Sequence, residues 1–267
     1  MERFFRRYAF LLLSYLFMVP GFCLYNGNPA LPEIPEEGFV ISKESWLSIK
    51  AGYQGDIVFE RTMKMTTGCD DCHQGISSFE STMNSGTFSM GFMDRVELYG
   101  LIGSYQLDMG QNPLSNTHIH YKTDRALGYQ GGVRAIVAYW GETKMGVDAK
   151  YFVAFPDIHS IHLHGSSVET RGAEIRDQQW QLGIGISHKI SFFIPYIGIN
   201  YLNVNTKVRH LSSLKAIFPK EKFTIKNTYP VGLFFGFSLA ADRALSASLE
   251  ARIFDETAAT AAIDFRF

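Results

Sequence analysis

The sequence predicts an all-β protein: a transmembrane antiparallel β-barrel of about 10 strands, with 8 to 12 allowed. Three observations predict this fold. Apolar and polar residues alternate along successive segments, short and long connections alternate between them, and the chain ends on a phenylalanine of the apolar face. Alternation places successive side chains on opposite faces of a strand. The alternative for the last strand is the edge of a soluble β-sandwich.

Composition narrows the class of protein. The chain has 267 residues, 46% of them hydrophobic and 14% aromatic, with 24 glycines. A formal net charge of −1 gives no reason to expect nucleic acid as a partner. Beyond the first 23 residues no run reaches the roughly 18 to 20 apolar residues of a membrane helix. If this chain crosses a membrane, it must therefore do so as strands.

The first 23 residues have the features of a cleaved signal peptide. Arg3, Arg6 and Arg7 precede an apolar stretch that Pro20 ends, and Cys23 is small enough for a cleavage site. An uncleaved anchor helix and a lipid-anchored Cys23 are the alternatives. Residues 24–44, rich in proline and glycine, are predicted to be a periplasmic lead-in, and residues 45–267 the barrel.

The alternating segments give ten expected strands. They cover residues 47–60, 79–93, 96–107, 131–140, 143–155, 174–187, 190–204, 223–240, 244–253 and 259–267. Connections after the second, fourth, sixth and eighth strands are short. Those after the first, third, fifth and seventh are long, and loop 205–222 has room for a further hairpin. Outer-membrane barrels have short periplasmic turns and long outer loops, so both termini are expected on the periplasmic side.

Charged residues on the presumed inner face are the candidate pore-lining residues. Toward lipid, each Arg or Lys would cost roughly 2 to 4 kcal/mol at the bilayer midplane, whereas in a wet lumen it sets the local field for ions. The alternative is that these charges pair with one another and fill a narrow barrel. The candidates are Lys50, Asp56, Glu60, Arg134, Asp148, Lys150, Glu250, Arg252, Asp264 and Arg266.

Several blocks, in order along the chain, resemble the chlamydial major outer membrane protein (porin) family. They are Gly27-Asn28-Pro29-Ala30, residues 52–61, Asp94-Arg95, residues 179–181 through 193–198, residues 252–256 and Phe265-Arg266-Phe267. The resemblance implies a homotrimeric outer-membrane porin that admits small solutes and stiffens the cell envelope through cysteine cross-links to other envelope proteins. The chain departs from the family in being shorter and poorer in cysteine.

Cys69 and Cys72 belong to the pattern Cys69-Asp70-Asp71-Cys72-His73, which formally matches c-type haem attachment. A local or intermolecular disulfide and free thiols are the other interpretations. No cofactor is expected, because no distal haem ligand is identifiable and the loop is predicted to lie outside the cell.

Histidines form the remaining candidate cluster: His159, His162 and His164 follow Asp157, and His118 and His120 lie nearby in sequence. Imidazoles at this spacing can bind zinc or nickel, but unliganded surface-loop histidines are the simpler interpretation, so no metal and no enzymatic activity are predicted. Phe265 and Phe267 are predicted to be a C-terminal assembly signal. The expected function is passive diffusion of small solutes through an outer-membrane, lipid-embedded barrel. A narrow, non-conducting structural or adhesive barrel is the alternative.

Overall fold

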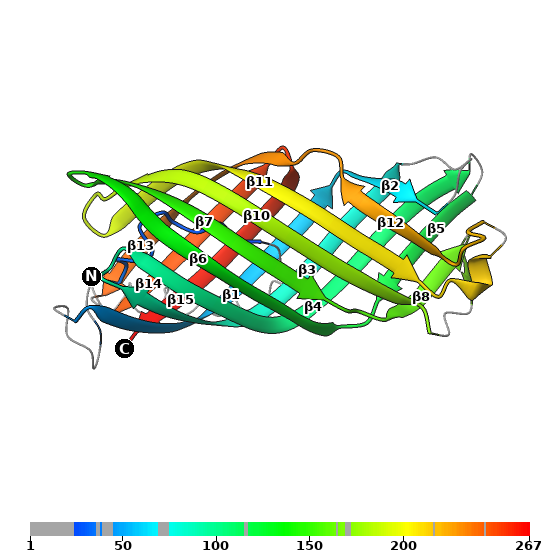
Figure 1. The fold of residues 1–267 in the computed structure, drawn as a ribbon, viewed down its shortest axis with the longest axis horizontal. Coiled ribbons are helices and arrows are strands. Elements are labelled where there is room, and N and C mark those ends of the chain that lie inside the picture. The colour runs from blue at the N-terminus through cyan, green and yellow to red at the C-terminus, as the bar shows by residue number, and fades with distance from the viewer. Residues whose placement is uncertain are drawn as a thin grey trace, which may run out of the picture.

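The computed structural model describes residues 24–35, 38, 45–68, 75–114, 117–163, 165–168, 172–215, 217–242 and 244–267. Ten long antiparallel strands in these residues form a closed barrel, which confirms the predicted fold class (Figure 1). They are β1 (Leu47–Arg61), β3 (Ile76–Phe92), β4 (Val96–Leu114), β6 (Ala126–Trp140), β7 (Thr143–Ala154), β10 (Glu174–His188), β11 (Phe193–Arg209), β13 (Val231–Asp242), β14 (Leu245–Ile253) and β15 (Glu256–Arg266). The predicted signal peptide lies outside the described residues.

Barrel closure depends on the pairing of the last strand with the first. Phe265 of β15 lies opposite Ala51 of β1, and Ile263 lies opposite Tyr53. On the other side of β1, strand β3 pairs with β1 and β4, so the described ring has no free edge. Figure 1 shows the C-terminus at the same end as the tight turn that joins β6 to β7. This is the end that the outer-membrane rule predicts to be periplasmic, and we name the two ends of the barrel on that prediction.

The predicted long loops are largely strands, which corrects the sequence analysis. The barrel continues outward as β2 (Met63–Thr67), β5 (Thr117–Thr123), β8 (Ile158–Leu163), β9 (Ser166–Val168) and β12 (Lys222–Asn227), with one 3₁₀ turn, η1 (Ser212–Leu214). In this outer part, β12 pairs with both β11 and β2. In the membrane part, three strands, β13, β14 and β15, lie between β11 and β1. The outer part of the barrel is therefore narrower. In the described part of the chain no helix has the length and apolarity needed to span a bilayer.

An apolar band bounded by aromatic side chains surrounds the barrel. Trp140 marks its periplasmic border on β6, and Tyr129 on the same strand marks its outer border with Tyr151 of β7. Trp180 of β10 stacks on Tyr201 of β11 at the same outer level, with ring centroids 5.2 Å apart. Eleven residues of tilted strand separate the two borders on β6, or about 28 Å, which matches the hydrocarbon thickness of a bilayer.

Side-chain polarity reverses beyond the outer aromatic border. In the membrane part of β3, Phe88 faces outward and Ser89 inward, but in the outer part Glu80 faces outward and Phe79 is fully buried inside. The outer part thus has the polar-outside, apolar-inside arrangement of a soluble protein, because water rather than lipid surrounds it. Its core includes Phe79, Tyr105, Leu107, Met109, Ile119, Tyr121, Phe152, Leu202, Val204, Val208, Phe218, Phe223 and Ile225; we call this set the outer core.

Residues 24–35 lie inside the membrane part of the barrel, from Leu24, which packs against the outer core, to Pro35, which contacts Arg266 near the periplasmic mouth; we call them the lumen segment. Leu24 and Tyr25 are buried, as are Asn26 and Asn28, which are at most 1% exposed. The sequence analysis places these residues in a periplasmic lead-in; the structure differs, because their backbone groups find partners on the charged inner wall. Most of the remaining lead-in, residues 36–37 and 39–44, lies outside the described residues.

The polarity reversal can be tested with two phenylalanines of β3. Phe79→Ala should lower the free energy of unfolding by about 3 to 5 kcal/mol, because it opens a cavity in the outer core. Phe88→Ala should cost far less, since Phe88 faces the surrounding detergent or lipid. Urea unfolding of refolded protein in micelles measures both changes. Equal losses would contradict the assigned border.

Candidate functional site: the charged barrel interior

The inner wall of the barrel carries most of the buried charge. Among the described residues, seven basic and seven acidic side chains of this interior are buried, and the partly buried Asp264 adds a further carboxylate. The buried side chains are Lys50, Arg61, Arg134, Lys144, Lys150, Arg252 and Arg266, and Asp56, Glu97, Asp148, Asp177, Glu250, Asp255 and Glu256. A charge removed from water is tolerated only where an opposite charge or hydrogen bonds compensate it. The arrangement of these pairs therefore decides what the interior can do.

The first cluster joins Lys50 of β1, Glu97 of β4, Arg134 of β6, and Asp148 and Lys150 of β7. Glu97 receives Lys50 Nζ at 2.6 Å on one oxygen and Arg134 Nη1 at 3.1 Å on the other. Asp148 lies 3.4 Å from Arg134 Nε and 2.9 Å from Lys150 Nζ. Each carboxylate thus bridges two cations, and no charge in this cluster stands alone.

The second cluster is centred on Arg252 of β14, which is fully buried. Its guanidinium meets Asp56 Oδ1 at 2.6 Å, Glu256 Oε1 at 2.7 Å and Glu250 Oε1 at 3.1 Å. Arg61 Nε donates to the other oxygen of Glu256 at 2.9 Å. A planar guanidinium with five donors suits this three-carboxylate arrangement better than an ammonium group would.

The lumen segment runs between the two clusters, and its backbone completes their coordination. Glu250 accepts hydrogen bonds from Asn26 N and Gly27 N, each at 2.9 Å. Lys150 donates to the carbonyl of Tyr25, and Arg134 Nη2 donates to the carbonyl of Asn26 at 3.3 Å. Charged wall groups and segment amides therefore satisfy one another, which makes the segment part of the interior.

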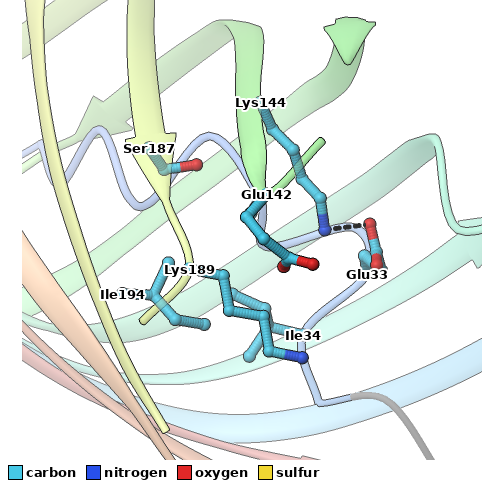
Figure 2. A pocket seen from close by; sticks show the side chains of 8 residues that line it. Glu33, Ile34, Glu142, Lys144, Ser187, Lys189 and Ile194 are labelled. Carbon is cyan, nitrogen blue, oxygen red and sulfur yellow. Dashed lines mark hydrogen bonds and ion pairs between the residues drawn. The ribbon is translucent and has the colours of Figure 1, made fainter. Parts of the chain in front are cut away.

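The segment is also held near the periplasmic mouth. Asn28 Nδ2 donates to Ile194 O at 3.0 Å, and Arg266 Nη1 donates to Pro35 O at 2.8 Å. Figure 2 shows Lys144 reaching from β7 to the carboxylate of Glu33, with which it forms an ion pair. These contacts fix the segment at its middle and at its exit.

Glycines on the inner wall leave room for the segment. A Cβ atom added to Gly183 would lie 2.7 Å from Asn26 Oδ1, and one added to Gly146 would lie 2.8 Å from Pro29 O. Both distances are too short for van der Waals contact, so larger side chains there would displace the segment. The wall and the segment are complementary in shape as well as in charge.

Little space remains around the segment. The cavity between the segment and the first cluster, bordered by Tyr25, Leu31 and Lys50, has a volume of about 30 Å³. A second cavity, next to Gly27 and Pro29, has about 10 Å³. A buried water needs at least roughly 10 to 15 Å³ by this measure, so these spaces hold one or two waters and no larger solute.

Nine of the ten predicted pore-lining residues lie in the interior. The first cluster contains Lys50, Arg134, Asp148 and Lys150, and the second contains Asp56, Glu250 and Arg252. Arg266 pairs with Asp94 at 2.9 Å, and Asp264 Oδ1 lies 3.5 Å from Thr87 Oγ1. Their role in ion passage stays a prediction.

Glu60 is the exception, and its predicted place in the lumen is corrected. A β-bulge between Val58 and Glu60 interrupts the two-residue period of β1. Glu60 is exposed beside Thr257, whereas Arg61 faces inward and contacts Glu256. Bulges add one residue to a strand and so reverse the faces beyond them.

Several interior residues were not predicted from the sequence. Arg61 was hidden by the bulge, and Glu256 was assigned to a turn although it begins β15. Glu97 was available from the alternation of β4, where its neighbours Val96 and Leu98 face outward.

The other predicted sites have mixed outcomes. Cys69 and Cys72 lie outside the described residues, as does His164. His159 Nδ1 lies 3.2 Å from Asp124 Oδ1, and His120 of β5 faces His162 of β8, but no group of three metal-ligating side chains occurs among the residues that the structure describes. Phe265 and Phe267 are partly exposed on the outer face; their assembly role stays a prediction.

Comparisons with known proteins identify distant relatives. No family model matches the chain. It is 21% identical over 264 residues to the major outer membrane porin of Chlamydia abortus, which covers 66% of this chain and 68% of the relative. A Chlamydia pneumoniae protein of the same description is 19% identical over 263 residues, with the same coverage.

A search of solved structures gives similarity to two outer-membrane proteins at low TM-scores. The outer membrane protease OmpT of Escherichia coli has a TM-score of 0.45 and 9% identity, covering 82% of this chain and 97% of that one. The translocator domain of the Neisseria meningitidis autotransporter NalP has a TM-score of 0.39 and 10% identity, covering 83% and 88%.

The second cluster can be tested with a double-mutant cycle. Arg252→Gln should destabilise the barrel by about 3 to 5 kcal/mol, because it leaves buried carboxylates without a cation. Asp56→Asn alone should cost less, since Arg252 keeps two other carboxylates. The double variant should lose at least about 1 kcal/mol less than the sum of the single losses. Unfolding in urea measures each value, and strict additivity would show that the two side chains do not interact.

Proposed function

We propose that this chain, a distant relative of the chlamydial major outer membrane porins, is a closed outer-membrane barrel with a structural, non-enzymatic role in the cell envelope. The observation that supports this proposal most strongly is the lumen segment, which fills the membrane part of the barrel and is held there by the wall's own charges. Lipid contacts the apolar band of the barrel.

Removing the lumen segment, which closes the periplasmic end of the barrel, would cost free energy. Withdrawing the segment takes two backbone donors from Glu250 and an acceptor from each of Lys150 and Arg134. A hydrogen bond to a charged group contributes about 1.5 to 3 kcal/mol. Water entering the lumen would replace part of this, but the segment also buries Leu31 and Ile34. The filled state is therefore the stable one in this proposal.

The outer core forms a second closure of different chemistry. Phe223 stacks on Phe218, with ring centroids 4.9 Å apart, and meets the ring of Tyr121 at a tilt, with centroids 5.9 Å apart. A hydrated ion or sugar would have to displace these rings from an apolar environment, which is unfavourable for both partners. Barrels of about eight strands are also just wide enough to be filled by their side chains, whereas open channels have 16 or more.

Passive diffusion of small solutes is the second candidate function. It is favoured by the description "major outer membrane porin" that the relatives carry. In this chain it would require the lumen segment to leave and the outer core to open. The paired interior charges, among them Arg134 and Arg252, would then line the path.

Conductance distinguishes the two candidates. Refolded full-length protein added to a planar bilayer should give no stepwise current, because both closures block the lumen. A variant lacking residues 24–35 should also stay silent, since the outer core remains in place. Heat-modifiable migration on a gel would verify that each protein is folded. Stepwise current from the full-length chain would support the porin and overturn the closed barrel.

Envelope cross-linking and trimer formation are part of the proposal and rest on the family resemblance. Cys69 and Cys72 are placed by the sequence in a long loop at the outer end. Purified outer membranes run without reductant should contain disulfide-linked species of this chain, and Cys69→Ser/Cys72→Ser should abolish them. Mass measurement of the detergent-extracted protein gives the oligomeric state. An unchanged non-reducing pattern in the variant would remove cross-linking from the proposal.

A further inference from the structure

The outward side of the barrel extension carries three pairs of positive residues in direct cross-strand register. Arg176 of β10 lies opposite Lys207 of β11, and Arg209 of β11 lies opposite Lys222 of β12. Lys226 of β12 lies opposite Lys64 of β2. Four neighbouring strands thus present one continuous surface of six cations. We call it the cationic face; its members are Lys64, Arg176, Lys207, Arg209, Lys222 and Lys226.

This register is unfavourable unless an anion is present. Directly opposite side chains on paired strands have Cβ atoms about 4.5 to 5.5 Å apart, and like charges there destabilise the sheet. The described carboxylates compensate little of this charge. Glu174 lies 3.8 Å from Arg209, and within the described ranges no carboxylate pairs with Lys64, Arg176, Lys207 or Lys226.

Arg176 adds a second observation that indicates a missing partner. Its guanidinium lies over the ring of Phe155, 5.5 Å from the centroid, which fixes its orientation. Its Nε atom is shielded from solvent yet has no hydrogen-bond acceptor among the described residues. A guanidinium whose orientation is fixed and whose Nε donor has no acceptor can donate a hydrogen bond to an anionic oxygen of a ligand.

The height of the cationic face identifies the class of ligand. Arg176 is four residues beyond Trp180 on β10, and Lys207 is six residues beyond Tyr201 on β11. These spacings put the cations about 10 to 16 Å above the outer aromatic border. A phospholipid headgroup layer extends only about 5 to 8 Å beyond the hydrocarbon on each side, so a ligand at this height needs a larger, sugar-containing headgroup. Lipid-facing Leu182 and Ile199 lie directly below on the same two strands.

We propose that the cationic face binds the phosphorylated headgroup of an anionic glycolipid in the outer leaflet, with the acyl chains against the apolar band below. A soluble polyanion would need only the charges. A lipid contacts both the charges and the apolar strand surface below them. Because the cationic face lies on the side of the barrel directly above the apolar band, we favour a lipid over a soluble polyanion. The proposal is independent of whether the lumen conducts.

The test uses full-length protein refolded in detergent and probed with bisphosphorylated lipid A, with dephosphorylated lipid A for comparison. Native mass spectrometry measures how much lipid each protein retains. Arg176→Gln/Lys207→Gln should weaken retention of the phosphorylated lipid by roughly 30-fold, as expected for two cations at an anionic surface. Without lipid, the same variant should have a higher Tm, because the repulsion between its two positions is gone.

The matched control is Lys122→Gln/Arg125→Gln. It removes two exposed cations from another side of the extension, where Lys122 already faces Asp108, and should retain lipid like the unmodified chain. Equal retention of the two lipids, or by the two variants, would overturn the proposal. Binding of heparin in preference to lipid A would also overturn it, because the ligand would then be a soluble polyanion.

Discussion

Ionised groups inside the barrel require a partner, and this constraint arranges the rest of the structure. Lipid outside forces apolar side chains outward, so charged residues of the same strands must point inward. There they are removed from most water and are stable only in pairs or networks. Arg252 with its three carboxylates is the clearest case. Where the wall alone leaves Glu250 and Lys150 incompletely satisfied, backbone groups of the lumen segment complete them.

Two closures of opposite chemistry follow from the two environments along the axis. In the membrane part the wall is polar and is filled by the proline-containing lumen segment, whose backbone groups and asparagines bond to the wall. Beyond the outer aromatic border, water surrounds the barrel, and the interior becomes an apolar core. Asp177 lies near the junction as a fully buried carboxylate, with Tyr105, Gln179 and Thr206 as hydrogen-bond donors. The interior therefore changes from ion pairs to aromatic packing within one continuous sheet.

Sequence reasoning was reliable where one rule held along a whole strand. Alternation located the barrel strands, although it joined β12 and β13 into one expected strand, 223–240, and it located nine interior charges, because lipid imposes the same polarity on every membrane strand. It failed where a second physical effect intervened. Because of the bulge in β1, Arg61 rather than Glu60 faces the interior. The outer strands have polar side chains outside and apolar side chains inside, the reverse of the membrane strands. A pattern that requires apolar side chains outside therefore predicted loops where β5 and β8 lie. The lumen segment has no periodic pattern, since its backbone makes the decisive contacts.

The position of the lumen segment also restricts how the protein can be assembled. The segment precedes β1, and β1 forms the closing seam with β15. A closed ring of strands offers no lateral entry, and the outer core obstructs the far end. The segment must therefore enter the interior before β1 pairs with β15, or enter afterwards through the periplasmic mouth. In both cases the filling of the interior depends on β1, which carries the segment on one end and forms the closing seam with β15.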